Sequence, residues 1–147
     1  MLMGEYRHNI DDKKRLVIPS KFRSELGENF ILTRGLDGCL FIYSQVEWNK
    51  IVDKLKNLPF TQKDARFFTR FFLSGATVCE IDQTGRISIT SPLIEYADIT
   101  KECVIIGAND HLEVWSKESW DKFLDNNIDN FSDIAENLFT TGDYNAL

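Results

Sequence analysis

The sequence predicts an α+β protein, mainly β, built from two tandem copies of one small β-hairpin module with connecting helices. Residues 10–18 (IDDKKRLVI) recur as residues 81–89 (IDQTGRISI), each position 71 residues later. A second series of matches follows at a spacing of 72 and pairs Leu32, Gly35, Leu40, Ser44 and Trp48 with Val104, Gly107, Leu112, Ser116 and Trp120. Apolar residues alternate before each repeated turn, as in strands, and recur at helical spacing after it.

The repeat divides the chain into four segments. The first module is expected at residues 3–50 and the second at 74–122. A helical connector is expected between them, at 51–73, and an acidic C-terminal tail with one short helix at 123–147.

Each module is expected to begin with a β-hairpin. Residues 6–10 alternate in the manner of a strand, residues 16–18 are apolar, and a tight polar turn joins the two. Pro19 ends the second strand because it has no N–H to donate to a ladder. A short helix over 20–26, closed by Gly27, follows.

A second hairpin and a helix complete the first module. Residues 30–33 and 40–43 predict two strands around a turn at 35–38. Ser44 and Glu47 have the spacing of a capping box, which begins a helix. The apolar face of that helix is formed by Trp48, Ile51, Leu55 and Leu58.

Further helices are predicted outside these hairpins. Ser116 begins the equivalent helix of the second module, and a helix that starts at Thr61 and ends at Gly75 lies between the modules. Its apolar stripe consists of Phe67, Phe68, Phe71 and Phe72. We expect this stripe to be core, with a docking face for a partner as the alternative. Residues 131–138 predict an amphipathic helix, and 140–147 are expected to fray.

Charge is unevenly distributed along the chain. The net charge of −6 argues at first against a nucleic-acid partner. Residues 109–147, however, hold nine acidic residues and two lysines, whereas residues 1–23 hold six Lys and Arg against three acidic residues. The chain therefore has a basic head and an acidic tail, which leaves a DNA-binding surface possible at the head.

The sequence gives little support to catalysis, secretion or membrane insertion. The histidines, His8 and His111, lack Cys, Asp or Glu at a metal-ligand spacing, and nucleotide-binding loops and Gly-x-Ser-x-Gly are absent. Cys39, Cys79 and Cys103 lie in apolar surroundings, which favours free buried thiols in a reducing compartment. We expect a cytoplasmic protein that is not an enzyme and has no metal, cofactor, membrane or small-molecule partner.

The repeated turn carries the residues with the clearest chemistry. Asp11 and Asp82 are suited to accept hydrogen bonds from downstream backbone N–H groups, and Gly85 suits a left-handed turn position. Arg15 and Arg86 follow their aspartates by four residues. Either the arginines pair with these aspartates or brace the neighbouring module, or they project outward and bind guanine or phosphate in a bidentate manner.

Lysines beside the first turn favour the DNA-facing interpretation. Lys13 and Lys14 precede Arg15, and Arg7 and Lys21 flank this stretch in the basic head. Lysines of this kind bind phosphates without reading the sequence. A two-stranded β-ribbon also fits the major groove of DNA. These residues, with Arg86, are therefore the candidate DNA-binding set.

The motif at residues 10–27 resembles the AbrB-like hairpin of bacterial regulators and antitoxins, and two tandem copies in a chain of this length resemble the MraZ family. The similarity extends to residues 3–6 (MGEY), 32–37 (LTRGLD), 71–76 (FFLSGA) and 134–137 (IAEN). The resemblance implies a swapped-hairpin barrel in which the two modules form a pseudo-dimer. It also assigns DNA contact to the paired turns, Asp11 with Arg15 and Asp82 with Arg86.

The same resemblance implies a function. Members of the MraZ family assemble into rings, bind short tandem repeats in a promoter, and repress the division and cell-wall gene cluster that includes their own gene. A nucleoid-associated homo-oligomer bound to double-stranded DNA is therefore expected. The alternative is an oligomeric interaction module, antitoxin-like or a scaffold, that does not bind DNA.

Two of the differences between the modules affect the conformation of their turns and their charge. Lys14 stands where the second turn has Gly85, which costs about 1 kcal/mol if this position requires a positive φ. Lys21 and Arg23 align with the uncharged Pro92 and Ile94. We therefore expect the second module to be less basic and to contribute less to DNA contact.

Overall fold

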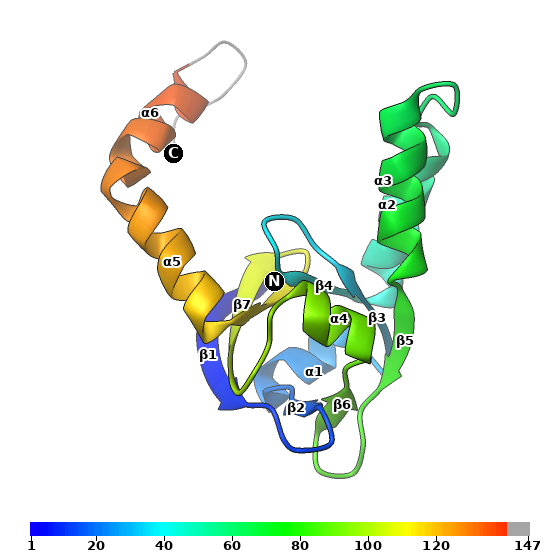
Figure 1. The fold of residues 1–147 in the computed structure, drawn as a ribbon, viewed down its shortest axis with the longest axis vertical. Coiled ribbons are helices and arrows are strands. Elements are labelled where there is room, and N and C mark those ends of the chain that lie inside the picture. Colours follow the sequence, from blue (N-terminus) through cyan, green and yellow to red (C-terminus); the bar gives the residue numbers. More distant parts are fainter. Residues whose placement is uncertain (141–147) are drawn as a thin grey trace. The chain divides into compact units, whose positions relative to one another are not determined.

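Two antiparallel sheets form the β part of the fold in the computed structural model, which describes residues 1–140 (Figure 1). The first module contains β1 (Leu2–Asn9), β2 (Arg15–Val17), α1 (Ser20–Leu26), β3 (Asn29–Arg34), β4 (Leu40–Tyr43) and α2 (Gln45–Lys56). After α3 (Lys63–Ser74), the second module contains β5 (Thr77–Glu80), β6 (Arg86–Ser88), α4 (Ser91–Tyr96), β7 (Glu102–Asn109), β8 (Leu112–Ser116) and α5 (Lys117–Asn127). A 3₁₀ turn (Ile128–Asn130) and α6 (Phe131–Phe139) follow.

The order of the strands shows that the two modules are related as the halves of a dimer. The larger sheet runs β1-β7-β8-β4-β3-β5, and the smaller one pairs β2 with β6. If each strand is exchanged for its counterpart in the other module, the order reads the same in reverse. A pseudo-twofold axis therefore passes between β4 and β8 and between β2 and β6. The predicted α+β class and the swapped pseudo-dimer are confirmed.

The predicted pairing of the first hairpin within each module is wrong. The tight turn forms, since Asp11 N donates to Arg15 O at 3.0 Å, but β1 then pairs with β7 and β2 with β6. The strands diverge because the apolar ends of both hairpins are buried together. Leu16 lies opposite Ile87 at the centre of the β2–β6 pair, and both are almost completely buried. The second hairpin, β3 with β4, forms as predicted.

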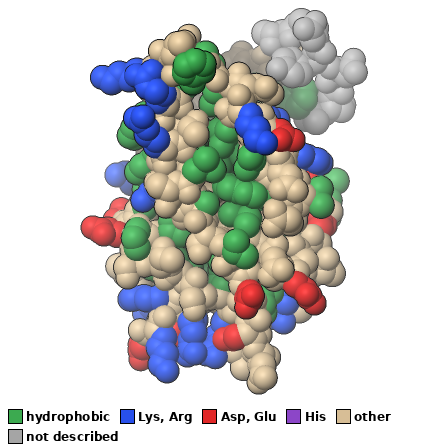
Figure 2. Space-filling view, turned by 90° about the vertical axis from the view of Figure 1, so that its right-hand side faces the viewer, with side chains coloured by type: hydrophobic (Ala, Val, Ile, Leu, Met, Phe, Trp, Pro, Cys, Tyr) green, Lys and Arg blue, Asp and Glu red, His purple; other side chains and the backbone are tan. Residues whose placement is uncertain are grey.

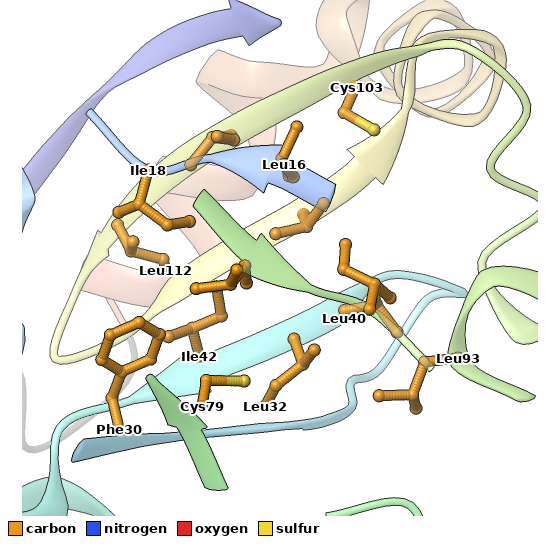
Figure 3. Packing of buried hydrophobic residues seen from close by; sticks show 14 of the residues in the cluster. Leu16, Ile18, Phe30, Leu32, Leu40, Ile42, Cys79, Leu93, Cys103 and Leu112 are labelled. Atoms are coloured by element: carbon orange, nitrogen blue, oxygen red, sulfur yellow. The ribbon is translucent and has the colours of Figure 1, made fainter. Parts of the chain in front are cut away.

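One core is shared by both modules. Figure 3 shows Leu16 and Ile18 of the first module within the same cluster as Leu93 and Leu112 of the second. All three cysteines are buried as free thiols, as expected. Burial raises the pKa of the Cys79 thiol to about 11, so this thiol is protonated at neutral pH.

The predicted helices form with small differences at their ends, and α4 is a helix that was not predicted from the sequence. Ser44 Oγ accepts a hydrogen bond from Glu47 N (3.3 Å), as predicted, but α2 ends at Lys56, before Leu58. Leu58 directly precedes Pro59, and the residue before a proline disfavours the helical conformation. The helix predicted from Thr61 begins at Lys63. Its apolar stripe is not core as a whole, because only Phe72 is buried while Phe67 is 64% exposed.

The chain packs as two units, one comprising residues 1–117 and one beginning at Glu118. The second unit contains most of α5, the 3₁₀ turn and the predicted amphipathic helix, observed as α6. Of the predicted fraying at 140–147, residues 141–147 lie outside the described residues. Within the described chain, no helix is both long and apolar enough to cross a membrane.

Candidate nucleic-acid interface

The first repeated turn is closed by the carboxylate of Asp11. Asp11 Oδ1 accepts hydrogen bonds from the backbone N–H groups of Lys13 (2.9 Å) and Arg15 (2.8 Å). Asp11 Oδ2 accepts a hydrogen bond from Arg15 Nε at 2.7 Å. One side chain therefore fixes both the backbone of the turn and the start of the Arg15 guanidinium.

The second turn repeats this arrangement. Asp82 Oδ1 accepts from Thr84 N (2.9 Å), Thr84 Oγ1 (3.0 Å) and Arg86 N (2.9 Å). Asp82 Oδ2 accepts from Arg86 Nε at 3.0 Å. The interpretation in which each arginine pairs with its own aspartate is thus correct for Nε in both turns. The terminal nitrogens of each guanidinium are not used by that bond.

The two turns are also tied to each other. Ile18 N donates to Gly85 O, and Ile89 N donates to Lys14 O, both at 2.9 Å. Arg86 Nη1 lies 3.4 Å from Asp11 Oδ2, across the module boundary. In Figure 1 the two loops lie next to each other below β2 and β6. The arginines of both modules are therefore held close together at one end of the unit formed by residues 1–117.

The fourth position of each turn is left-handed. Lys14 has a φ of 61° and Gly85 a φ of 82°. This position therefore requires a positive φ in both modules, and the difference between the turns expected from the sequence is real. Lys14 carries the associated strain of about 1 kcal/mol, whereas Gly85 does not.

Hydrogen bonding lowers the pKa values of both aspartates. The backbone N–H of Arg86 is the main cause at Asp82, and burial opposes it; the pKa of Asp82 falls to about 2. At Asp11 burial raises the pKa, but the hydrogen bonds from Arg15 and Lys13 together outweigh it and lower the pKa. Both carboxylates are ionised at neutral pH and balance part of the positive charge of the arginines.

Not all of the predicted DNA-binding residues gather at the turns. Lys13, Lys14, Arg15 and Arg86 do, and Figure 2 shows Lys and Arg side chains with interspersed acids at the lower end of the molecule. Arg7 lies on β1, where its guanidinium is 3.3 Å from Glu5 and 3.4 Å from Glu102. Lys21 Nζ lies 5.6 Å from the centre of the Tyr6 ring. The contacts of both are with β1 and β7 rather than with a turn.

The structure adds one cation that sequence reasoning assigned to the other turn. Arg23 is on α1 of the first module, yet its guanidinium lies against Gly85 of the second. Its Nε donates to Ile18 O at 2.8 Å. Spacing along the chain gave no signal for this placement, because it depends on the pairing of β2 with β6.

A second polar cluster surrounds His111 on the β7–β8 hairpin. Its ring nitrogens lie 2.8 Å from Asp110 Oδ1 and 3.0 Å from Glu113 Oε2, and its ring lies 4.5 Å from that of Phe41. Burial lowers the pKa of His111, but the two carboxylates outweigh it and raise the pKa. Among the described residues, no group of three or more His, Cys, Asp or Glu side chains is arranged to hold a metal.

Comparison with known proteins identifies close relatives. The family model "MraZ protein, putative antitoxin-like" matches the chain twice, at residues 1–71 and 72–142. The chain is 54% identical over 138 residues to "Transcriptional regulator MraZ" of Ligilactobacillus salivarius (strain UCC118) and 56% identical over 138 residues to the protein of that name in Thermoanaerobacter sp. (strain X514). Each alignment covers 94% of this chain and 96% of the relative.

The left-handed turn position predicts different costs for the same substitution in the two turns. Gly85→Ala places a Cβ on a backbone with a φ of 82° and against the Arg23 guanidinium, so we expect it to lower the free energy of unfolding by at least about 1–2 kcal/mol, the cost of the left-handed conformation alone. Lys14 already has a Cβ at the equivalent position, so Lys14→Ala, the matched control, should leave the free energy of unfolding nearly unchanged. Urea denaturation at equal protein concentrations measures both. Equal losses would contradict the assignment of strain to this position.

The lowered pKa of Asp82 predicts an acid-dependent loss of stability. Because the folded-state pKa is depressed, the contribution of Asp82 is complete above its ordinary pKa of 3.8 and is lost as the pH falls through about 2. Asp82→Asn should therefore be less stable at pH 7 and lose less stability than the wild type between about pH 4 and 2. Thermal melts across this range provide the measurement. An equal loss of stability in Asp82→Asn and the wild type over this range would contradict the prediction.

Proposed function

We propose, from the premise that the chain belongs to the MraZ family of transcriptional regulators, that it binds double-stranded promoter DNA through the paired turns of its two modules. The expectation that it is not an enzyme is confirmed by this membership. The observation that carries the proposal is the fixed pair of arginines, Arg15 and Arg86, at one end of the shared core.

The geometry of each arginine favours base contact. The side chains of Arg15 and Arg86 are 29% and 28% exposed, and each is anchored to its aspartate through Nε. Such an anchor fixes the plane of the guanidinium before DNA binds, so less conformational entropy is lost on binding. The terminal nitrogens can then donate to O6 and N7 of a guanine in the major groove. The pairing with aspartate and the outward role are therefore compatible.

The lysines of the first turn have a different role in this proposal. Lys13 and Lys14 are exposed at the tip of the turn and make up part of the positive cluster at that end. Exposed lysines contact phosphate oxygens and strengthen binding to any sequence, in a manner that salt weakens. Arg7 and Lys21 would contribute only to the more distant positive potential, because their contacts are elsewhere.

We further propose a repressor that occupies short tandem repeats in the promoter of the division and cell-wall gene cluster that includes its own gene. Such a protein would be associated with the nucleoid. Several copies joined in one assembly suit tandem repeats, because after the first contact the others become intramolecular. Modest affinity per chain would then give firm occupancy of the whole promoter.

Two unlike apolar surfaces support self-association into a ring. On α3, Phe67, Phe68 and Phe71 are exposed beside Arg66 and Arg70, and Figure 2 shows hydrophobic side chains gathered on this face. In the second unit, an apolar groove of about 550 Å³ is lined by residues that include Ile128, Phe131, Ile134 and Leu138. Acidic residues Asp129, Asp133 and Glu136 accompany it. Contact between unlike surfaces on successive copies generates a closed ring when the rotation closes.

The alternative function, an oligomeric interaction module that does not bind DNA, is favoured by the same Phe surface. This alternative predicts that the turns only stabilise the fold and that the exposed phenylalanines form the surface that binds other chains. Measuring affinity for DNA and the mass of the assembly separately distinguishes the two.

Substitutions in the turns should separate base reading from phosphate contact. Arg15→Ala and Arg86→Ala should each reduce the preference for cognate repeats over scrambled DNA, since a bidentate base contact contributes about 1–3 kcal/mol. Lys13→Ala combined with Lys14→Ala should weaken binding to both duplexes and keep the preference. Fluorescence anisotropy with duplexes from upstream of the gene measures both quantities.

Stability must be followed in the same variants, since each arginine also closes a turn. Arg15→Lys keeps the charge without the planar fork and should likewise lose preference. If a folded Arg15→Ala protein keeps its full preference, the arginine is a brace and base reading is refuted.

Assembly should depend on the exposed Phe surface. Phe67→Gln, at a side chain that is 64% exposed, should leave the fold intact and reduce the mass of the assembly, as should Phe131→Gln in the apolar groove of the second unit. Val46→Gln on α2, 65% exposed, is the matched control and should have no effect. Light scattering at several concentrations measures the mass. An unchanged mass in both Phe variants would refute these surfaces as the interface.

A further inference from the structure

Arg23 belongs to the first module but lies beside the turn of the second module. We infer that it supplies the second turn with the phosphate-binding cation that this turn lacks in its own sequence, so that DNA contact by the second module depends on a side chain of the first. This inference rests on the proposed DNA binding. It replaces the expectation, drawn from the alignment of Arg23 with Ile94, that the second turn is the weaker one.

A short chain of hydrogen bonds positions Arg23. Its Nε donates to the carbonyl oxygen of Ile18 at 2.8 Å, and the N–H of the same Ile18 donates to the carbonyl oxygen of Gly85 at 2.9 Å. The residue that joins the first module to the second turn thus also holds the guanidinium. The position of Arg23 at Gly85 follows directly from the exchange of strands.

Gly85 makes room for this guanidinium. A Cβ at Gly85 would lie 2.1 Å from Nη2, 2.5 Å from Cζ and 2.9 Å from Nη1 of Arg23, all far inside van der Waals contact. Any other residue at position 85 would have to displace the arginine. The glycine therefore serves two purposes, since it also allows the φ of 82°.

The first turn has a cation at its fourth position by a different arrangement. There Lys14 occupies the left-handed position, and the counterpart of Arg23 is Ile94, which has no charge. Each turn consequently has one cation at its fourth position. In the first turn this cation is Lys14, a residue of the turn itself. In the second turn it is Arg23, which comes from α1 of the other module.

The remaining donors of Arg23 suit a phosphate. Nε is used by Ile18, and for Nη1 and Nη2 the structure records no acceptor among residues 1–140. The residue is partly buried, which holds the guanidinium in place, and it lies beside a turn whose Arg86 would reach the bases. A fixed guanidinium with two free nitrogens matches the geometry of a DNA phosphate oxygen pair.

The test is the salt dependence of DNA affinity, measured with the full-length protein and a duplex of tandem repeats. For Arg23→Gln we expect binding weaker by on the order of tenfold at low salt, with a log-log slope lower by about 0.9 for each chain that contacts the DNA. The preference for cognate over scrambled DNA should not change, because phosphates carry no sequence information. Lys56→Gln, which removes a cation at the end of α2, is the matched control and should alter neither quantity.

A compensating variant keeps the test decisive if loss of Arg23 disturbs the fold. Arg23→Ile together with Gly85→Lys gives the second turn the same pair of residues that the first turn has in Ile94 and Lys14. We expect this double variant to recover the wild-type salt slope, whereas Arg23→Ile alone does not. Gly85→Lys alone should melt at a lower temperature than the double variant, because its Cβ meets the arginine.

The outcomes separate this inference from the proposed function. If the wild type shows no binding even at low salt, the proposed function fails and the inference with it. If the wild type binds but Arg23→Gln keeps both its affinity and its slope, only the role of Arg23 is refuted. A lower melting temperature with an unchanged slope also refutes it, since Arg23 would then be a structural brace alone.

Discussion

The antiparallel pairing of β2 with β6 is the interaction on which the rest of the structure depends. Three residues of each module meet there, with Leu16 opposite Ile87 at the centre. This pairing forces β1 and β5 to leave their own turns and join the other module's β7 and β3. It also buries the core residues of both modules together, so neither module has a complete apolar interior by itself. The stability of the fold and the spacing of the two arginines consequently have the same origin.

The sequence predicted most of the elements but could not predict which strands pair. Repeated spacing placed the turns, the second hairpins and the helices that follow them, because these depend on local patterns. The strand that pairs with β2 could not be predicted in this way. Leu16 and Ile87 belong to equivalent patterns, so either module offers β2 the same apolar surface. Only the resemblance to a known family indicated the exchange. Phe67 was misjudged because helical spacing identifies an apolar face but not what covers it.

The candidate site shows the same division between local and tertiary information. Hydrogen bonds within each turn, from Arg15 to Asp11 and from Arg86 to Asp82, follow from a spacing of four residues and were foreseeable. The positions of Arg7 and Lys21 depend on which strand lies beside them, so counting charges near the first turn could not show that they contact β1 and β7. Arg23 was assigned to the wrong turn for the same reason. Arg7 and Arg23 are long side chains with a neighbour from the other module, Glu102 and Gly85, whereas Lys21 lies over Tyr6 of its own module.

The unequal turns, Lys14 in one and Gly85 with Arg23 in the other, give the proposed DNA-contacting surface a direction. A homodimer of single modules would present two identical turns, and a duplex turned end for end beneath it would meet the same groups. Here a peptide linker joins the halves, so each could change without changing its counterpart. Because the two turns differ, the proposed contact would distinguish the two orientations of the chain along a duplex.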